Sequence, residues 1–206
     1  MAAIIFDFDG TVADSFEYIA DFLAYEAGLE PLTKKEKEKL RGQSMAAIGR
    51  KFGISWIKLI RLFFKGRSRM HIAMSHVEPF EGMPEVIEKL HAEGHELFML
   101  SSNTVRNIHA FLHNHGLYEY FLQIYGGIGL FGKAPSLRRL LRDQQIDMEN
   151  AVYVGDELRD VQSAKSIGLR VVAVTWGFAR PSALKSAKPT ALASSPKELL
   201  KALEEL

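Results

Sequence analysis

The chain has 206 residues, of which 47% are hydrophobic and 25% charged, and its 26 basic and 25 acidic residues give a formal net charge of +1. This composition is typical of a globular protein with one sizeable core, and the balanced charge argues against a nucleic-acid or membrane-surface binder. The absence of cysteine excludes disulfides, thiolate metal sites and cysteine nucleophiles, and fits a cytoplasmic protein. We expect no signal peptide and no membrane span, since the apolar runs are far shorter than about 20 residues.

The first predicted element is a strand over Ala3–Phe8, an apolar run that ends beside two aspartates, Asp7 and Asp9. Continuous apolar runs are typical of parallel strands, which are covered on both faces. Burying ionised carboxylates there is costly unless they are paired or bind a metal. Because residues i and i+2 of a strand project to the same side, Asp7 and Asp9 are expected to face one site and Phe8 the core.

The next segment, residues 14–82, contains no convincing strand and predicts a run of helices. Thr33 and Ser55 are of the residue types that cap helix N-termini. So long a helical insertion after the first strand indicates a separate lobe over the sheet. The predicted helices are Ser15–Ala27, Lys34–Arg41, Ser44–Phe52, Ser55–Lys65 and one around Ser68–His76.

The predicted helix over Ser55–Lys65 carries both a wide apolar face and a basic stripe of Lys58, Arg61 and Lys65. The stripe could meet an anionic substrate or face solvent. The apolar face could belong to the core of the lobe or to a dimer contact, so we expect a monomer or a homodimer. The apolar face consists of Trp56, Ile57, Leu59, Ile60, Phe63 and Phe64.

Beyond residue 82, short apolar runs alternate with helical patterns, which indicates βα units and a parallel sheet. A weaker strand candidate lies near Ile124 and Tyr125. We therefore predict an α/β fold, with a Rossmann-like parallel sheet core from residues 1–13 and 83–206 and an inserted all-helical domain from residues 14–82. The strands are expected at Glu96–Leu100, Ala151–Val154 and Arg170–Val174, and the helices at Met83–Glu93, Val105–His115, Ser136–Gln144 and Asp160–Ile167.

Polar side chains follow three of these strands, at the carboxyl ends where open α/β sheets bind ligands. Lys133 opens a later helical unit and could reach the same place. Ser101 could instead cap the helix that starts near Thr104, and Ser102 could be structural or a peripheral phosphate contact. Asn103 could line the pocket or hold a turn. The strand-end groups are Asp7 and Asp9, then Ser101, Ser102 and Asn103, then Asp156, Glu157 and Asp160.

These residue types suit one chemistry. Clustered carboxylates favour a hard cation such as Mg²⁺, while a lysine, a serine hydroxyl and backbone N–H groups suit a phosphate. An aspartate can attack phosphorus to form an aspartyl-phosphate, and the cation would screen the repulsion between the two anions. A second carboxylate could protonate the leaving oxygen and then deprotonate the attacking water.

The stretch "DFDGTVADS", residues 7–15, resembles the first motif of the haloacid dehalogenase superfamily, D-x-D-G-T-hydrophobic-x-D-S. Ser101, Lys133 and "VGDELRDVQSA" resemble its second, third and fourth motifs, in the family order and over nearly the whole chain. Where the family usually shows Lys-Pro, this chain has Lys-Ala-Pro. The helical insertion resembles the C1-type cap, and the tail "VVAVTWGFA" resembles the phosphoglycolate phosphatase branch.

The resemblance implies a role for each motif residue. Asp7 would be the nucleophile and a ligand of Mg²⁺, and Asp9 the general acid and base, with its backbone carbonyl on the metal. Ser101 would hydrogen-bond the phosphoryl group. Lys133 would pair with the nucleophile and the phosphoryl oxygens, and Asp156 would ligate Mg²⁺ directly or through water.

The resemblance also implies supporting roles around these groups. Asp160 would orient metal ligands or metal-bound water, although it could be an ordinary acid of a first helical turn. Glu157 would be an outer acid that interacts favourably with the helix dipole. Gly10 and Thr11 would shape the loop after the first strand, and backbone amides near Phe8 would donate to phosphate.

The sequence therefore predicts a Mg²⁺-dependent phosphomonoester hydrolase that acts on a small phosphorylated metabolite, with phosphoglycolate as the nearest family substrate. A phosphomutase of the β-phosphoglucomutase type is the first alternative, because it uses the same aspartates. Haloacid dehalogenase chemistry is disfavoured because those members lack the aspartate at position 9. A non-enzymatic phospho-acceptor is disfavoured because such receivers are shorter and lack the helical insertion.

Overall fold

The core of the computed structural model is a six-stranded parallel sheet in the order β3-β2-β1-β4-β5-β6. The model describes residues 1–40, 43, 45–55, 57–58, 61–62, 65, 74, 76–129 and 133–206. In the central strand, Phe6 pairs with Met99 of one neighbour and with Val154 of the other. The strands are β1 (Ala3–Phe6), β2 (Glu96–Leu100), β3 (Phe121–Tyr125), β4 (Ala151–Gly155), β5 (Arg170–Val174) and β6 (Ala191–Ala193).

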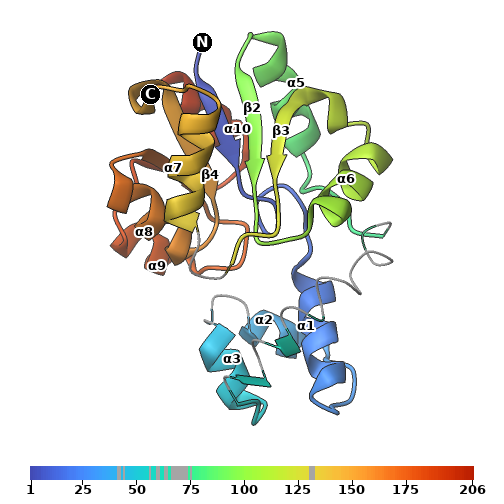
Figure 1. Cartoon of the computed structure of the whole chain (residues 1–206). Helices are drawn as coiled ribbons and strands as arrows, with labels where there is room; N and C mark the ends of the chain where they lie inside the picture. Colours follow the sequence, from blue (N-terminus) through green and yellow to red (C-terminus); the bar gives the residue numbers. More distant parts are fainter. Residues whose placement is uncertain are drawn as a thin grey trace.

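The chain changes direction across the sheet between β1 and β4. It runs from β1 outward through β2 and β3, then returns to place β4 on the other side of β1. In such sheets a ligand crevice opens beyond the strand ends at this switch point. Asp7 follows β1 and Asp156 follows β4, so both lie at that crevice. Figure 1 shows the strand arrows directed towards the helices of the insertion.

Two layers of helices cover the sheet because its strands are apolar on both faces. In β1, Ile4 and Phe6 face one core cluster, with α5, α6 and α10, whereas Ala3 and Ile5 face the other, with α7, α8 and α9. The helices of the core are α5 (Met83–Ala92), α6 (Val105–Asn114), α7 (Lys133–Asp143), α8 (Leu158–Ile167), α9 (Pro181–Ser186) and α10 (Pro196–Glu204), with short 3₁₀ helices at Tyr118–Tyr120 and Met148–Asn150.

The insertion between β1 and β2 has a hydrophobic cluster of its own, which includes Phe16, Leu23 and Leu40. It lies beyond the carboxyl ends of the strands (Figure 1). Two backbone hydrogen bonds tie its entry to its exit, from Asp14 N to Glu78 O at 2.9 Å and from Phe80 N to Val12 O at 3.0 Å. Among its described residues, the helices are α1 (Phe16–Glu26), α2 (Lys34–Leu40) and α3 (Met45–Lys51).

The predicted α/β fold and its helical insertion are confirmed, with differences at element ends. The first strand ends at Phe6 rather than Phe8, because the chain turns there and Phe8 O accepts hydrogen bonds from the amides of Thr11, Val12 and Ala13. The sequence patterns missed β6, α9 and α10. Most of the helix predicted around Ser68–His76 lies outside the described residues, and the domain boundaries at 13/14 and 82/83 stay predictions. Within the described part of the chain, no helix is long and apolar enough to cross a bilayer.

Candidate active site

A buried lysine joins two carboxylates at the centre of the site. Lys133, the first residue of α7, donates from Nζ to Asp7 Oδ2 at 2.5 Å and also to Asp160 Oδ1. Asp7 Oδ1 accepts a second hydrogen bond from the amide of Phe8 at 2.8 Å. The Lys133 ammonium lies 5.5 Å from the ring centroid of Tyr153, which is buried below it on β4. Lys133 therefore links the residue that follows β1 to the first turn of α8.

Burial and mutual attraction oppose each other in this cluster. Burial raises the pKa of Asp7 from 3.8 to about 7, against the stabilising charge of Lys133. Burial also lowers the pKa of Lys133, but the charges of Asp160 and Asp7 outweigh it, and the pKa of the lysine is raised overall. The ionised form of Asp7 thus depends on nearby positive charge.

The carboxylate of Asp156 is held from two sides. Thr11 Oγ1 donates to its Oδ1 at 3.0 Å, and the backbone N–H of Phe178, in the loop after β5, donates to its Oδ2 at 2.6 Å. A Cβ atom added at Gly10 or at Gly177 would lie 2.3 or 2.2 Å from Asp156 Oδ2. Only glycine fits at these two positions, so the backbone itself packs against the carboxylate.

Three buried carboxylates converge in this crevice. Asp7, Asp156 and Asp160 each offer one oxygen, and these oxygens lie within 4.8 Å of one another. Burial, followed by the charges of Glu157, Asp160 and Asp7, raises the pKa of Asp156 well above its usual value. Crowded buried carboxylates are stable in ionised form only with a cation between them, and oxygen donors suit a hard cation. The triad therefore forms a candidate metal site.

Asp9 has a separate set of partners from Asp7. Its carboxylate accepts a hydrogen bond from Ser15 Oγ at 2.7 Å and from Asn103 Nδ2 at 3.2 and 3.1 Å to its two oxygens. Burial raises the pKa of Asp9, and the hydrogen bonds from Ser15 and Asn103 oppose that rise. Asn103 Oδ1 in turn accepts from the amide of Thr104 and from Asn107 Nδ2, so this residue both holds its turn and contacts the site.

Ser101 and Ser102 are buried at the end of β2, next to the same crevice. Ser101 Oγ accepts a hydrogen bond from the amide of Asn103 at 3.0 Å. The alternative that Ser101 caps α6 is wrong, because Thr104 is the N-cap and its hydroxyl accepts from the amide of Asn107.

Asp160 and Glu157 form a capping box at the start of α8. The amide of Glu157 donates to Asp160 Oδ2 at 2.8 Å, and the Glu157 side chain accepts from the backbone of Asp160. Asp160 therefore acts as an acid of the first helical turn, as one of the two predictions had it, and it also pairs with Lys133, which was not predicted. These hydrogen bonds from two sides hold the Asp160 carboxylate in one orientation.

The basic stripe of the insertion is exposed to solvent at Lys58, Arg61 and Lys65, and Lys65 pairs with Glu26 at 2.7 Å. In the apolar face predicted beside it, Ile57 is exposed. Its other members lie outside the described residues, at Trp56, Leu59, Ile60, Phe63 and Phe64.

Three residues of the site were missed in the sequence. Gly177 and Phe178 lie in the tail "TWGFA", and the Phe178 ring also packs against Phe16 of the insertion with ring centroids 5.5 Å apart. Arg159 stands next to Asp160 within the fourth motif and donates to Glu157 Oε1 at 2.7 Å. The available signal was that each residue lies within four positions of the end of a strand, Gly177 and Phe178 after β5 and Arg159 after β4.

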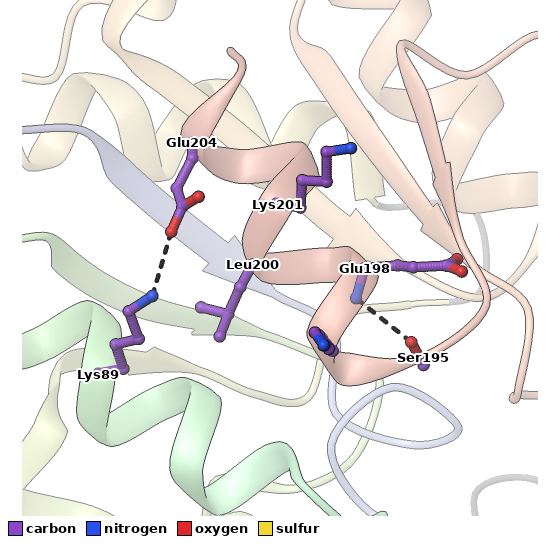
Figure 2. A pocket seen from close by; sticks show the side chains of 7 residues that line it. Lys89, Ser195, Glu198, Leu200, Lys201 and Glu204 are labelled. Carbon is purple, nitrogen blue, oxygen red and sulfur yellow. Dashed lines mark hydrogen bonds and ion pairs between the residues drawn. The ribbon is translucent and has the colours of Figure 1, made fainter.

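A separate surface groove of about 450 Å³ lies between α5 and α10 and contains none of the predicted site residues. Figure 2 shows Lys89 of α5 paired across it with Glu204 of α10 at 3.1 Å, and Ser195 accepting from the Glu198 amide. Lysines and glutamates both line this groove, which argues against a site that binds anions or cations strongly.

The chain matches a family model described as haloacid dehalogenase-like hydrolase over residues 4–174. It is 35% identical over 209 residues to a phosphoglycolate phosphatase of Synechococcus elongatus, covering 100% of this chain and 99% of that protein. It is also 26% identical over 192 residues to an N-acetylmuramic acid 6-phosphate phosphatase of Pseudomonas aeruginosa, covering 88% of this chain and 84% of that one.

A likeness in structure extends over the whole chain. The crystal structure of a predicted phosphatase from Clostridium acetobutylicum superposes with a TM-score of 0.84 at 23% identity, covering 100% of this chain and 99% of that chain. At this identity the likeness speaks for the fold, including the helical insertion between β1 and β2.

Proposed function

The chain belongs to the family of haloacid dehalogenase-like hydrolases, and we propose that it is a Mg²⁺-dependent phosphomonoesterase for a small organic phosphate, with Asp7 as its nucleophile. One observation carries the proposal: a buried Asp7, paired with Lys133 at 2.5 Å, shares a crevice with Asp156 and Asp160. This arrangement supports a site that combines a nucleophilic carboxylate, a cation that can bind phosphoryl oxygens, and a metal site.

Mg²⁺ would be held by Asp7, the backbone carbonyl of Asp9 and Asp156, with Asp160 behind them. When bound, it would screen the charge of the nucleophile from that of the phosphate. The donor set fits this ion, because all these groups offer oxygen and Mg²⁺ keeps some of its waters. Asp160 already accepts from Lys133 and from the amide of Glu157, which fits a supporting position behind the ligands.

In the first half-reaction, a carboxylate oxygen of Asp7 attacks phosphorus and the ester P–O bond breaks. The alcohol leaves with a proton from Asp9, and the phosphoryl group stays on Asp7 as an aspartyl-phosphate. The raised pKa of Asp9 supports this role, because a protonated carboxyl is needed at the start. Water then attacks phosphorus and gives its proton to Asp9, which releases inorganic phosphate and restores Asp7.

The phosphoryl oxygens would be gripped by Ser101 and Lys133, with Ser102 at the periphery. Gly10 and Thr11 would support this grip indirectly. Thr11 donates to Asp156, and the positive φ of Gly10, +80°, lets the loop turn tightly against the same carboxylate. The amide of Phe8 already donates to Asp7 Oδ1 in this structure. This amide therefore orients the nucleophile and is not free to donate to phosphate.

Phosphoglycolate is the substrate that we propose, because the 35% identical relative that matches the chain from end to end is a phosphoglycolate phosphatase. The N-acetylmuramic acid 6-phosphate phosphatase among the relatives acts on a larger phosphate, so the substrate has to be tested. The insertion would cover the crevice and exclude bulk water during turnover. A cytoplasmic location and a monomeric or homodimeric state stay predictions.

The alternatives differ in what they require of Asp9 and of the aspartyl-phosphate. Haloacid dehalogenation requires neither Mg²⁺ nor a carboxylate at position 9. A phosphomutase would keep the aspartyl-phosphate and return its phosphoryl group to a sugar. Ser15 and Asn103 donate hydrogen bonds that orient the Asp9 carboxylate. This orientation favours a role for Asp9 in proton transfer, which both the phosphatase and the phosphomutase require.

Phosphate release tests the proposal. With MgCl₂, the wild-type protein should release inorganic phosphate from 2-phosphoglycolate faster than from N-acetylmuramic acid 6-phosphate or glucose 6-phosphate. EDTA should stop the reaction, and added Mg²⁺ should restore it. Conversion of β-glucose 1-phosphate to glucose 6-phosphate without phosphate release would instead establish the mutase, and activity in EDTA on a chlorinated acid would establish the dehalogenase.

A further inference from the structure

Arg159 places a second cation beside the acidic crevice, and most of its hydrogen-bonding capacity is unused. It lies in the first turn of α8, three residues after Asp156 and one before Asp160. Its Nη2 donates to Glu157 Oε1 at 2.7 Å. Its Nε and Nη1 atoms are buried and have no hydrogen-bond partner within the described part of the chain.

Unpaired donors of this kind require an explanation. A buried N–H without a partner costs its full desolvation free energy, and more so on a charged group that cannot lose its proton. A side chain whose task was only to hold Glu157 would need Nη2 alone. A cation at the N-terminal turn of a helix also opposes the helix dipole. The arrangement favours an anion that arrives from outside the protein.

The guanidinium lies beside the acidic residues at the start of α8. Arg159 directly precedes Asp160, which pairs with Lys133, and it contacts Glu157 through Nη2. Lys133, by contrast, already has two carboxylate partners, Asp7 and Asp160. Arg159 is therefore the better placed of these two cations to receive a new anionic group.

We propose that Arg159 is a substrate-binding residue, whose Nε and Nη1 donate hydrogen bonds to an oxygen of the anionic substrate. The proposal rests on the phosphomonoesterase function. The oxygen belongs either to the phosphoryl group, which every phosphomonoester has, or to a carboxylate carried by the rest of the substrate, as in phosphoglycolate. A guanidinium suits both because it presents its donors in a planar fork.

Steady-state kinetics of Arg159→Gln and Arg159→Lys distinguish the two sources. The substrates are 2-phosphoglycolate, which has a carboxylate, and p-nitrophenyl phosphate, which has none. For a carboxylate contact, Arg159→Gln should raise the KM for phosphoglycolate about 10- to 100-fold, the range of a charge-assisted hydrogen bond, and leave p-nitrophenyl phosphate unaffected. For a phosphoryl contact, kcat/KM should fall with both substrates. Arg159→Lys should recover only part of the loss.

Arg138→Gln is the matched control, since Arg138 is an exposed arginine of α7 and the change removes the same charge. Unchanged kinetics of Arg159→Gln with both substrates, in a protein whose thermal unfolding is unaltered, would overturn the proposal. If Arg159→Gln unfolds at a lower temperature, binding is measured instead. 2-Phosphoglycolate and inorganic phosphate are titrated calorimetrically into Asp7→Asn and into Asp7→Asn/Arg159→Gln. Equal affinities of these two proteins for both ligands would overturn the proposal. An inactive wild-type protein would contradict the phosphomonoesterase function, while the same titrations would still report on Arg159.

Discussion

The backbone N–H of Phe178 donates to Asp156 Oδ2 at 2.6 Å. The ring of the same Phe178 packs against Phe16, the first residue of α1 in the insertion. The loop after β5 therefore touches a proposed metal ligand through its backbone and the insertion through its side chain. A movement of the insertion would therefore displace this loop and, with it, the hydrogen bond to the carboxylate that is proposed to hold Mg²⁺.

The close packing of this loop predicts that Gly177→Ala weakens Mg²⁺ binding. The added Cβ would lie 2.2 Å from Asp156 Oδ2 and 2.3 Å from Gly10 O, so the carboxylate or the loop has to move. We expect weaker Mg²⁺ binding and a fall of about 1–3 kcal/mol in the free energy of unfolding, as is usual for overpacking. Calorimetric Mg²⁺ titration and urea unfolding measure both. Gly129→Ala is the control, because no atom of the described residues lies within 4 Å of its added Cβ. Equal Mg²⁺ affinity of the two variants would refute the prediction.

The hydrogen bonds from Asn103 predict a shift in the pH dependence of activity. They lower the pKa of Asp9, so Asn103→Ala should raise it. The limbs of the pH–rate profile that depend on Asp9, as acid or as base, should then move to higher pH. The exposed Asn114, at the end of the helix α6 that follows Asn103, provides the control variant, Asn114→Ala. A profile that stays in place or moves to lower pH would show that Asn103 does not tune Asp9.

Lys133 is expected to contribute to stability as well as to phosphate binding. Lys133→Met leaves two buried carboxylates, Asp7 and Asp160, without their cation. Loss of one partner from a buried ion pair typically costs about 3–5 kcal/mol. Chemical unfolding in EDTA measures the loss, and Lys89→Met, which removes a solvent-exposed pair with Glu204, should cost far less. Equal losses from the two variants would mean that the buried pair adds little.

The raised pKa of Asp7 predicts how the metal-free protein responds to pH. The folded carboxyl titrates near pH 7 instead of 3.8, so between these values the folded state binds more protons at this group than the unfolded state does. The contribution of Asp7 to stability is therefore complete below about pH 4 and is lost as the pH rises through 7. In EDTA, the free energy of unfolding of wild type minus that of Asp7→Asn should fall across this window. A difference that is flat or rises with pH would contradict the assignment.

The sequence was informative where local pattern determines structure. Apolar runs located the strands, and the polar residues that follow them were correctly expected at one edge of the sheet, where Asp7, Lys133, Asp156 and Asp160 meet. The β6 strand was missed because three residues, Ala191–Ala193, carry too little periodicity to be distinguished from a loop.

The rest of the site depends on contacts between distant segments. The packing of Gly177 against Gly10 and Asp156 joins three parts of the chain that no local pattern connects. The unused donors of Arg159 likewise become visible only once its surroundings are known. Sequence patterns therefore selected the candidate residues of the site, while their hydrogen-bond partners required the structure.

The central claim is that Asp7 carries the phosphoryl group during turnover. Rapid acid quenching of the protein with 2-phosphoglycolate and Mg²⁺, followed by mass spectrometry of its peptides, tests this directly. We predict that the peptide containing Asp7 gains the mass of one phosphoryl group, and that Asp7→Asn neither gains it nor releases phosphate. Phosphate release by Asp7→Asn at the wild-type rate, or a phosphoryl group on another residue, would contradict the account.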